Sequence, residues 1–236
     1  MRFNAVLLDL DGTLVNTIAD LADATNAMLA ELGHAPLSLE TVTSYVGKGS
    51  ETLVMRALTR DLTQDAAAPN LRSPSAADTA TALDIFFRHY RRLNGLRSEL
   101  YPGVLEGLRA FRQAKVKLAV VTNKPEEFTH TLLVRKGLAH FFDAVVCGDT
   151  CERKKPHPMP LLHACNILDV PPAHALMIGD SMNDARAARA AGIAVLAVPY
   201  GYNENQSVQD LDVDDIVSSI QDAARWAAQE QQTQNS

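Results

Sequence analysis

Short apolar runs alternate with longer amphipathic stretches over much of this chain. The runs lie at residues 5–8, 118–121, 144–147, 175–178 and 193–198, and helix-like segments follow at roughly 103–114, 126–138, 158–168 and 183–191. Uninterrupted apolar runs of this length are typical of strands that are covered on both faces. The alternation of such strands with helices therefore predicts an α/β fold built on a doubly wound parallel sheet.

The stretch from about residue 16 to residue 94 has a different pattern. It lacks the apolar runs and predicts helices at 18–32, 50–62 and 77–94, with a loop at 63–75. Because it interrupts the alternation just after the first strand, it predicts an inserted α-helical cap domain. We expect residues 1–15 and 97–228 to form the core domain, 16–96 the cap, and 229–236 a frayed tail. The two crossings, near Asn16 and near 97–101, would act as a hinge.

Composition narrows the classes of function. The chain has 236 residues, 47% hydrophobic and 21% charged, with a net charge of −6. An acidic balance argues against a nucleic-acid partner. We expect no membrane partner and a cytoplasmic location, because no apolar run is long enough to span a bilayer and Asp9 interrupts the first run too early for a signal peptide. The three cysteines form no CxxC pair and indicate reduced thiols.

Polar side chains gather where the predicted strands end. Asp9 and Asp11 follow the first run two residues apart, so both start on the same side of the strand. Thr122 and Asn123 follow the second run, and Asp180 follows the fourth. Doubly wound sheets bind ligands beyond the carboxyl ends of their strands. Taken alone, each motif could be ordinary turn chemistry, but their agreement predicts one site.

Four motifs carry a resemblance to a known family: Asp9-Leu10-Asp11-Gly12-Thr13, Thr122-Asn123, Lys155-Pro156 and Gly179-Asp180-Ser181-Met182-Asn183-Asp184. In this order and at strand ends, they resemble the signature of the haloacid dehalogenase superfamily phosphatases. Weaker similarities at 45–49, 100–104, 121–125, 155–158 and 200–203 favour the bacterial phosphoglycolate phosphatases within that superfamily.

The resemblance implies a role for each motif. Asp9 would be the nucleophile that forms an aspartyl-phosphate, and Asp11 the general acid and then the base. Thr122 and Asn123 would bind phosphoryl oxygens. Lys155 would balance the negative charge; its neighbour Lys154 is the alternative, which we expect in solvent.

The resemblance also implies a bound Mg²⁺, which prefers hard oxygen ligands. The family pattern assigns it to the carboxylates of Asp9 and Asp180 and to the backbone carbonyl of Asp11. Asp184 would support the water shell of the metal from the start of the next helix, and Ser181 would cap that helix.

The sequence gives weaker indications of the residues that determine substrate specificity. Gly47 and Lys48 lie in a predicted cap loop, where the glycine would let the backbone approach a small substrate and the lysine could pair with its carboxylate. A plain exposed turn is the alternative, and Lys124 and Arg56 are other candidates for the carboxylate. Asn16 stands where these phosphatases usually carry an acidic residue, so a hinge contact that needs a carboxylate is in doubt.

The sequence thus predicts a Mg-dependent phosphatase that hydrolyses 2-phosphoglycolate, with a small phosphorylated metabolite as partner and a monomeric or homodimeric state. The alternatives are a phosphatase for another small phosphate ester or for pyrophosphate, and a sugar phosphomutase on the same scaffold. A non-catalytic binding protein would be expected to show degraded motifs, and none of the four is degraded.

Overall fold

The computed structural model describes residues 2–70 and 72–233 and is built on a six-stranded parallel sheet. The strands follow the order β5-β4-β1-β6-β7-β8. Their bounds are β1 Ala5–Leu8, β4 Lys117–Val121, β5 Ala144–Val146, β6 Ala175–Gly179, β7 Ala194–Ala197 and β8 Asp215–Ile216. In register, Leu8 of β1 lies beside Val120 of β4 and Ile178 of β6. The predicted doubly wound α/β fold is therefore confirmed.

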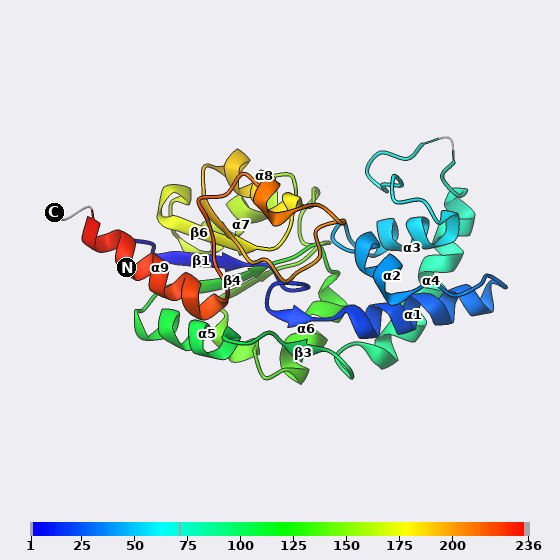
Figure 1. The fold of residues 1–236 in the computed structure, drawn as a ribbon, viewed down its shortest axis with the longest axis horizontal. Helices are drawn as coiled ribbons and strands as arrows, with labels where there is room; N and C mark the ends of the chain where they lie inside the picture. The colour runs from blue at the N-terminus through cyan, green and yellow to red at the C-terminus, as the bar shows by residue number, and fades with distance from the viewer. Residues whose placement is uncertain (1, 71, 234–236) are drawn as a thin grey trace.

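Helices cover both faces of this sheet (Figure 1). One layer contains α5 Val104–Gln113, α6 Glu126–Arg135 and α9 Ile220–Thr233; the other contains α7 Met159–Leu168 and α8 Met182–Ala191. Side chains alternate along β1, so Val6 and Leu8 pack with the first layer and Leu7 with the second. Three single-turn helices, η1 Ala139–Phe141, η2 Pro172–His174 and η3 Val208–Asp210, lie in the connections.

A separate helical block lies beyond the carboxyl edge of the sheet (Figure 1). It consists of α1 Ile18–Glu31, α2 Leu39–Tyr45, α3 Ser50–Thr59 and α4 Ala76–Leu93, and it forms the predicted cap. Its hydrophobic core is distinct from that of the sheet and includes Met28, Val54 and Phe86, all fully buried. The sequence predicted α1, α3 and α4 but not the seven-residue α2. Helix α3 ends before the expected residue 62 because Arg60 adopts a left-handed conformation.

The two crossings between core and cap form a short antiparallel ribbon. Its strands are β2 Val15–Asn16 and β3 Glu99–Leu100. Asp20, fully buried in α1, accepts hydrogen bonds from the backbone amides of Gly95 (2.8 Å), Arg97 (2.8 Å) and Ser98 (3.0 Å). These hydrogen bonds hold the second crossing, at residues 95–98, against helix α1, which follows the first crossing. The boundaries at 15/16 and 96/97 stay a prediction; the ribbon lies within the crossings expected near Asn16 and near 97–101.

Helix α9 was not predicted from the sequence. It extends to Thr233 and so includes residues 229–233 of the expected tail; residues 234–236 lie outside the described part of the chain, and fraying of the tail stays a prediction. The helix forms because Ile220, Ala223 and Ala227 are fully buried in the hydrophobic core that α9 shares with α5 on this face of the sheet. The edge strand β8 was also not predicted.

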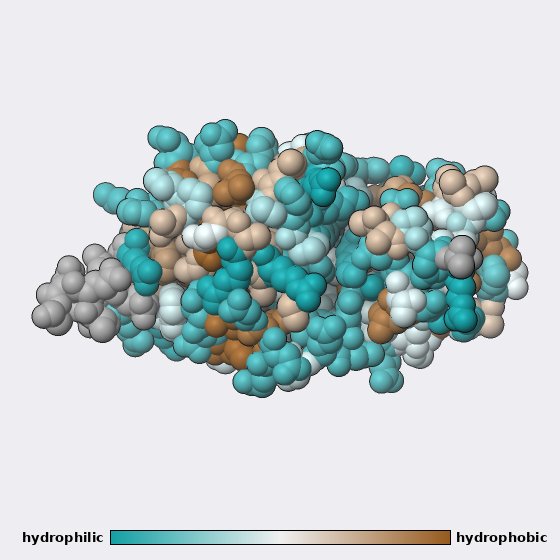
Figure 2. All heavy atoms as spheres, turned by 90° about the horizontal axis from the view of Figure 1, so that it is seen from above, coloured by the Kyte–Doolittle hydropathy of each residue, from teal (hydrophilic) through white to brown (hydrophobic). Residues whose placement is uncertain are grey.

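The surface seen in Figure 2 is mostly hydrophilic, with smaller apolar areas between the polar side chains. Over residues 2–70 and 72–233, no helix has both the length and the apolar character needed to cross a bilayer.

Candidate active site

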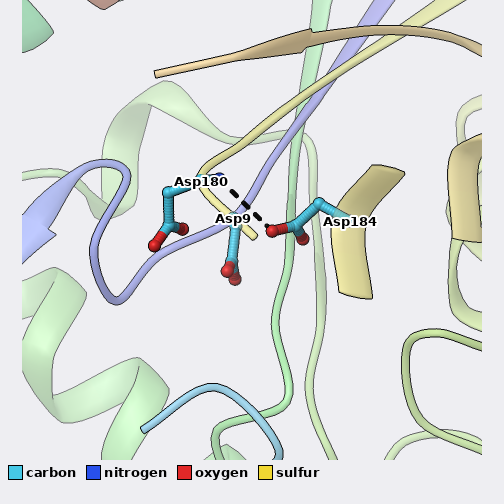
Figure 3. A group of neighbouring side chains, drawn as sticks. All are labelled: Asp9, Asp180 and Asp184. Carbon is cyan, nitrogen blue, oxygen red and sulfur yellow. Dashed lines mark hydrogen bonds between the residues drawn. The ribbon is translucent and has the colours of Figure 1, made fainter. Parts of the chain in front are cut away.

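Three predicted carboxylates meet at the carboxyl edge of the sheet. Asp9 follows β1, Asp180 follows β6, and Asp184 lies in the first turn of α8 (Figure 3). One oxygen from each lies within 4.8 Å of the others, and Asp180 and Asp184 are buried. The strands β1 and β6 are neighbours whose chains continue to opposite sides of the sheet, which is where such sheets place a binding crevice.

Lys155 and Ser181 fix this carboxylate cluster. The Lys155 ammonium lies 2.6 Å from Asp184 Oδ1 and 3.0 Å from Asp9 Oδ1. Asp184 Oδ2 accepts hydrogen bonds from the Ser181 hydroxyl (2.7 Å) and the Ser181 amide (3.1 Å), so Ser181 caps α8 as expected. Lys155 is 3% exposed, whereas Lys154 is in solvent. The structure therefore brings Lys155, and not its neighbour, to the carboxylates.

The cluster carries more negative charge than Lys155 balances. Burial raises the pKa of Asp9 to about 7, with Lys155 lowering it and Asp184 raising it. Burial, together with Asp184 and Asp9, also raises the pKa of Asp180 well above its ordinary value. Burial alone would lower the pKa of Lys155, but Asp184 and Asp9 raise it. Burial and neighbouring carboxylates raise the pKa of the two acids, and the opposite charge of the carboxylates raises the pKa of the lysine.

This charge pattern fits a bound cation. Asp9 Oδ1 is buried and accepts no hydrogen bond from the described residues, although it pairs with Lys155. Asp9 and Asp180 offer hard oxygen ligands, and within the described part of the chain Asp180 accepts only from neutral donors. Asp184, in contrast, lies 2.6 Å from the Lys155 ammonium and also accepts from Ser181. The donor set therefore suits a divalent ion that prefers oxygen ligands. Asp9 and Asp180 could bind the ion itself, and Asp184 could contact its water ligands.

Glycines let other parts of the chain approach Asp180. A Cβ on Gly12 would lie 2.4 Å from Asp180 Oδ2, and one on Gly201 would lie 2.2 Å from the same oxygen. Gly12 also has φ +88°, which favours glycine. The Thr13 hydroxyl donates to Asp180 Oδ1 at 2.8 Å and the Tyr202 amide to Oδ2 at 2.6 Å. These close contacts set the direction of the Asp180 carboxylate.

Thr122 and Asn123, at the end of β4, lie beside the carboxylates. The Asn123 side chain donates to the carbonyls of Lys155 (2.9 Å) and Gly47 (3.1 Å) and accepts from the Lys155 amide (3.0 Å). Asn123 therefore joins the Lys155 loop to a cap loop. Thr122 and Asn123 both line the cavity, where the Thr122 hydroxyl and the backbone amides could meet a phosphoryl oxygen.

A cavity lies between the sheet edge and the cap. Its volume is about 520 Å³, the open mouth included. Asp9, Asp11, Thr122, Asn123, Lys124 and Asp180 line it from the core, and Leu21, Val46, Gly47, Gly49, Ser50 and Leu53 line it from the cap. The predicted residues Asp9, Asp11, Thr122, Asn123, Gly47 and Asp180 are thus brought to one cavity.

The three basic residues considered for the substrate carboxylate lie in different places. Lys124 lines the cavity, is 5% exposed and pairs with Asp11, which also lines it, at 3.1 Å. Lys48 is not among the lining residues and pairs with Asp65 at 2.8 Å. Arg56 is 1% exposed and pairs with Glu204 of the core at 2.8 Å. Of these three residues, Lys124 is the one in position to meet a ligand in this cavity.

The sequence analysis missed the role of two tyrosines. The Tyr202 hydroxyl accepts hydrogen bonds from the amides of Thr17 (2.8 Å) and Ile18 (3.1 Å) and donates to Asn16 Oδ1 at 2.8 Å. It therefore ties the loop that holds Asp180 to the first crossing, and Asn16 takes part without a carboxylate. Tyr90 of the cap reaches Lys124 at 2.5 Å. Residue 202 lies in one of the weaker sequence similarities, at 200–203, whereas no motif in the sequence pointed to Tyr90.

Comparisons with known proteins agree with this fold. Residues 6–198 match the family described as haloacid dehalogenase-like hydrolase. The phosphoglycolate phosphatase of Nitrosospira multiformis is 50% identical over 225 residues, which cover 95% of this chain and 96% of that protein. The phosphoglycolate phosphatase of Thiobacillus denitrificans is 46% identical over 224 residues, 95% of either chain.

A solved structure shows the same likeness. The crystal structure of a predicted phosphoglycolate phosphatase from Haemophilus somnus 129PT superposes with a TM-score of 0.87 at 32% identity, covering 96% of this chain and 99% of that one. The chain therefore belongs to the haloacid dehalogenase-like hydrolases. Within that family it is a phosphatase, a hydrolase of phosphoric monoesters.

Proposed function

We propose that this phosphatase hydrolyses 2-phosphoglycolate to glycolate and phosphate with the help of a bound Mg²⁺. The observation that carries the proposal is the cavity itself, which has Asp9 and Asp11 on its core side and a buried ammonium, Lys124, within it. A small ester could place its phosphoryl group beside Asp9, where Lys155 and a bound cation would offset the negative charge, and its carboxylate beside the Lys124 ammonium. The names of the relatives from Nitrosospira multiformis and Thiobacillus denitrificans support the same substrate.

In this mechanism the phosphoryl group passes through Asp9. An Asp9 oxygen bonds to phosphorus as the phosphorus–oxygen bond of the ester breaks, and Asp11 gives its proton to the departing alkoxide of glycolate. Water then attacks phosphorus and passes a proton to Asp11. The bond to Asp9 breaks, and phosphate leaves. Thr122 and Asn123 would hold the phosphoryl oxygens throughout, and Lys155 would keep Asp9 in place.

Asp9, Asp180 and the backbone carbonyl of Asp11 would hold the Mg²⁺, and Asp184 would support its water ligands. When bound, the ion offsets negative charge, so that an anionic carboxylate can approach an anionic phosphoryl group.

A substrate panel tests this proposal. Phosphate release would be measured with 2-phosphoglycolate, glucose phosphates, nucleotides and pyrophosphate, each with Mg²⁺ and with excess chelator. We expect the highest kcat/KM with 2-phosphoglycolate and no release under chelation. A higher kcat/KM with pyrophosphate or a sugar phosphate would show that 2-phosphoglycolate is not the preferred substrate. Conversion of a sugar phosphate without net phosphate release would indicate a mutase.

Thermal stability should show that Mg²⁺ binding depends on pH. The pKa of Asp9 is raised from 3.8 to about 7, so between these values the folded protein holds a proton that the unfolded chain has lost. The metal-free protein should therefore lose stability as pH rises from about 4 to 7. Metal ligands must be deprotonated, so the increase in Tm on adding Mg²⁺ should grow over the same range, to about 5–10 °C at saturation.

Asp180→Asn, which removes a charge at this site, should show a much smaller increase in Tm. An increase that is the same at pH 5 and pH 7.5, or that Asp180→Asn leaves unchanged, would contradict the proposed metal site.

Two lysine variants decide which residue meets the substrate carboxylate. We expect Lys124→Gln to raise the KM for 2-phosphoglycolate by about tenfold or more relative to ethyl phosphate, which lacks the carboxylate, because a hydrogen bond to a charged group is worth about 1.5–3 kcal/mol. Lys48→Gln should change that ratio less than about twofold, because Lys48 lies outside the cavity, where it pairs with Asp65. The opposite ranking would assign the carboxylate to Lys48.

A further inference from the structure

Tyr90 connects the cap to the group proposed as the leaving-group acid. It lies in the last turn of α4, in the cap, and its side chain is 1% exposed. Its hydroxyl accepts a hydrogen bond from the Lys124 ammonium at 2.5 Å. The same ammonium lies 3.1 Å and 3.2 Å from the two carboxylate oxygens of Asp11. A cap residue thus reaches Asp11 through one intermediate side chain.

The tyrosine ring is held rigidly. It stacks on Phe86 at a centroid distance of 5.4 Å and meets Phe128 of α6 at 4.9 Å. Lys124 lies 4.7 Å from the ring centroid, within the range of a cation–π contact. Phe128 belongs to the core domain, so the Tyr90 ring packs between cap and core. The position of its hydroxyl is therefore fixed by packing and not by solvent.

The geometry around Lys124 shows what the hydroxyl does. An ammonium has three donors and no acceptor. The Lys124 ammonium donates hydrogen bonds to both Asp11 carboxylate oxygens and to the Tyr90 hydroxyl. Its distances to Asp11 are longer than the 2.7–2.9 Å usual for a charge-assisted hydrogen bond, while the distance to Tyr90 is shorter. The hydroxyl is thus the nearest of these partners to the ammonium, and the ammonium in turn contacts both oxygens of the Asp11 carboxylate.

We propose that Tyr90 is a positioning residue: through Lys124 it holds the Asp11 carboxylate in the orientation from which it transfers a proton to the leaving alkoxide. The proposal rests on the proposed function, in which Asp11 is that acid. Because Tyr90 belongs to the cap, proton transfer is complete only when the cap lies against the core. The cap then contributes to catalysis as well as to covering the cavity.

Proton transfer has a specific kinetic signature. An alkoxide is a poor leaving group and needs a proton, whereas acetate leaves without one. Ethyl phosphate and acetyl phosphate are nearly the same size, both lack the substrate carboxylate, and they differ in this requirement. A misplaced Asp11 should slow phosphoryl transfer from ethyl phosphate and leave transfer from acetyl phosphate almost unchanged. A defect in packing or in cap closure would slow both.

The experiment compares kcat/KM for these two esters in Tyr90→Phe, which keeps the ring and removes the hydroxyl. We expect kcat/KM for ethyl phosphate to fall about tenfold or more, part of the 10²–10⁴ that general acid catalysis supplies, and the value for acetyl phosphate to change less than about twofold. Tyr45→Phe is the matched control, because Tyr45 is a buried cap tyrosine that does not line the cavity. It should leave both values unchanged.

Two further variants separate the possible failures. Phe86→Leu disturbs the stacking and keeps the hydroxyl, so a loss that it shares with Tyr90→Phe, equal for both esters, would assign Tyr90 a packing role and overturn the proposal. Asp11→Asn should show the same selective loss as Tyr90→Phe, to a greater degree. If Asp11→Asn slows both esters equally, the acid role of Asp11 fails and the proposed mechanism fails with it. If only Asp11→Asn is selective, the inference about Tyr90 alone is overturned.

Discussion

Asp9→Asn is expected to lower phosphate release from 2-phosphoglycolate by at least about a thousandfold, the scale of loss seen when a catalytic nucleophile is removed. An amide oxygen is a far weaker nucleophile than a carboxylate, and no other carboxylate of the cluster is free to replace it. Asp184 is held by Lys155 and Ser181, and Asp180 by Thr13 and the Tyr202 amide. The rate would be measured as free phosphate at saturating Mg²⁺.

The fold of Asp9→Asn should be intact. Since burial raises the pKa of Asp9 to about 7, its charged form is costly near neutral pH, and an uncharged amide of the same size should not lower the Tm of the metal-free protein at pH 7.5. Asp169→Asn, an exposed acid that ends α7, is the matched control and should keep full activity. Residual turnover of Asp9→Asn above about one per cent of wild type would exclude Asp9 as the nucleophile.

Lys155→Met should affect both stability and activity. The ammonium is buried between Asp9 and Asp184, and removing one partner of a buried ion pair costs about 3–5 kcal/mol because the other charge stays buried. Methionine keeps most of the apolar stem, so the loss reports the charge. We also expect kcat to fall by about 10²–10³, the range for removing one electrostatic group from an active site.

The neighbouring lysine provides the control for this prediction. Lys154→Met changes an exposed residue and should alter the free energy of unfolding by less than about 0.5 kcal/mol. Urea unfolding at pH 8 and pH 5 would compare the two variants. The loss in Lys155→Met should be smaller at pH 5, where protons can neutralise the carboxylates that have lost their partner. Equal effects of the two variants would show that Lys155 does not balance the cluster.

The core of the fold and of the site could be predicted because its signals are local. Uninterrupted apolar runs marked the strands, and the polar residues that follow them had to meet at one edge of a parallel sheet. For this reason Asp9, Asp180 and Asp184 were expected together, as the structure shows. Lys155 was chosen over Lys154 by the Lys-Pro motif, and its burial agrees with that choice.

Contacts between cap and core could not be predicted because they join residues that are far apart in the chain. Tyr90 meets Lys124 across 34 positions and Tyr202 meets Thr17 across 185. The pairing of Lys48 with Asp65, and of Arg56 with Glu204, likewise depends on how two elements pack and not on a motif. Helix α9 was missed for a related reason: its small buried residues, such as Ala223 and Ala227, gain stability only from the surface they cover.

Transfer of the phosphoryl group to Asp9 is the step on which the whole account depends, and trapping the intermediate tests it most directly. The enzyme would be mixed with 2-phosphoglycolate and Mg²⁺, quenched in acid within milliseconds and digested for mass spectrometry. We predict one added phosphoryl group on the peptide that contains residues 5–16, located at Asp9 and missing from Asp9→Asn. A phosphoryl group on another residue, or full turnover with no labelled peptide at any quench time, would contradict the account.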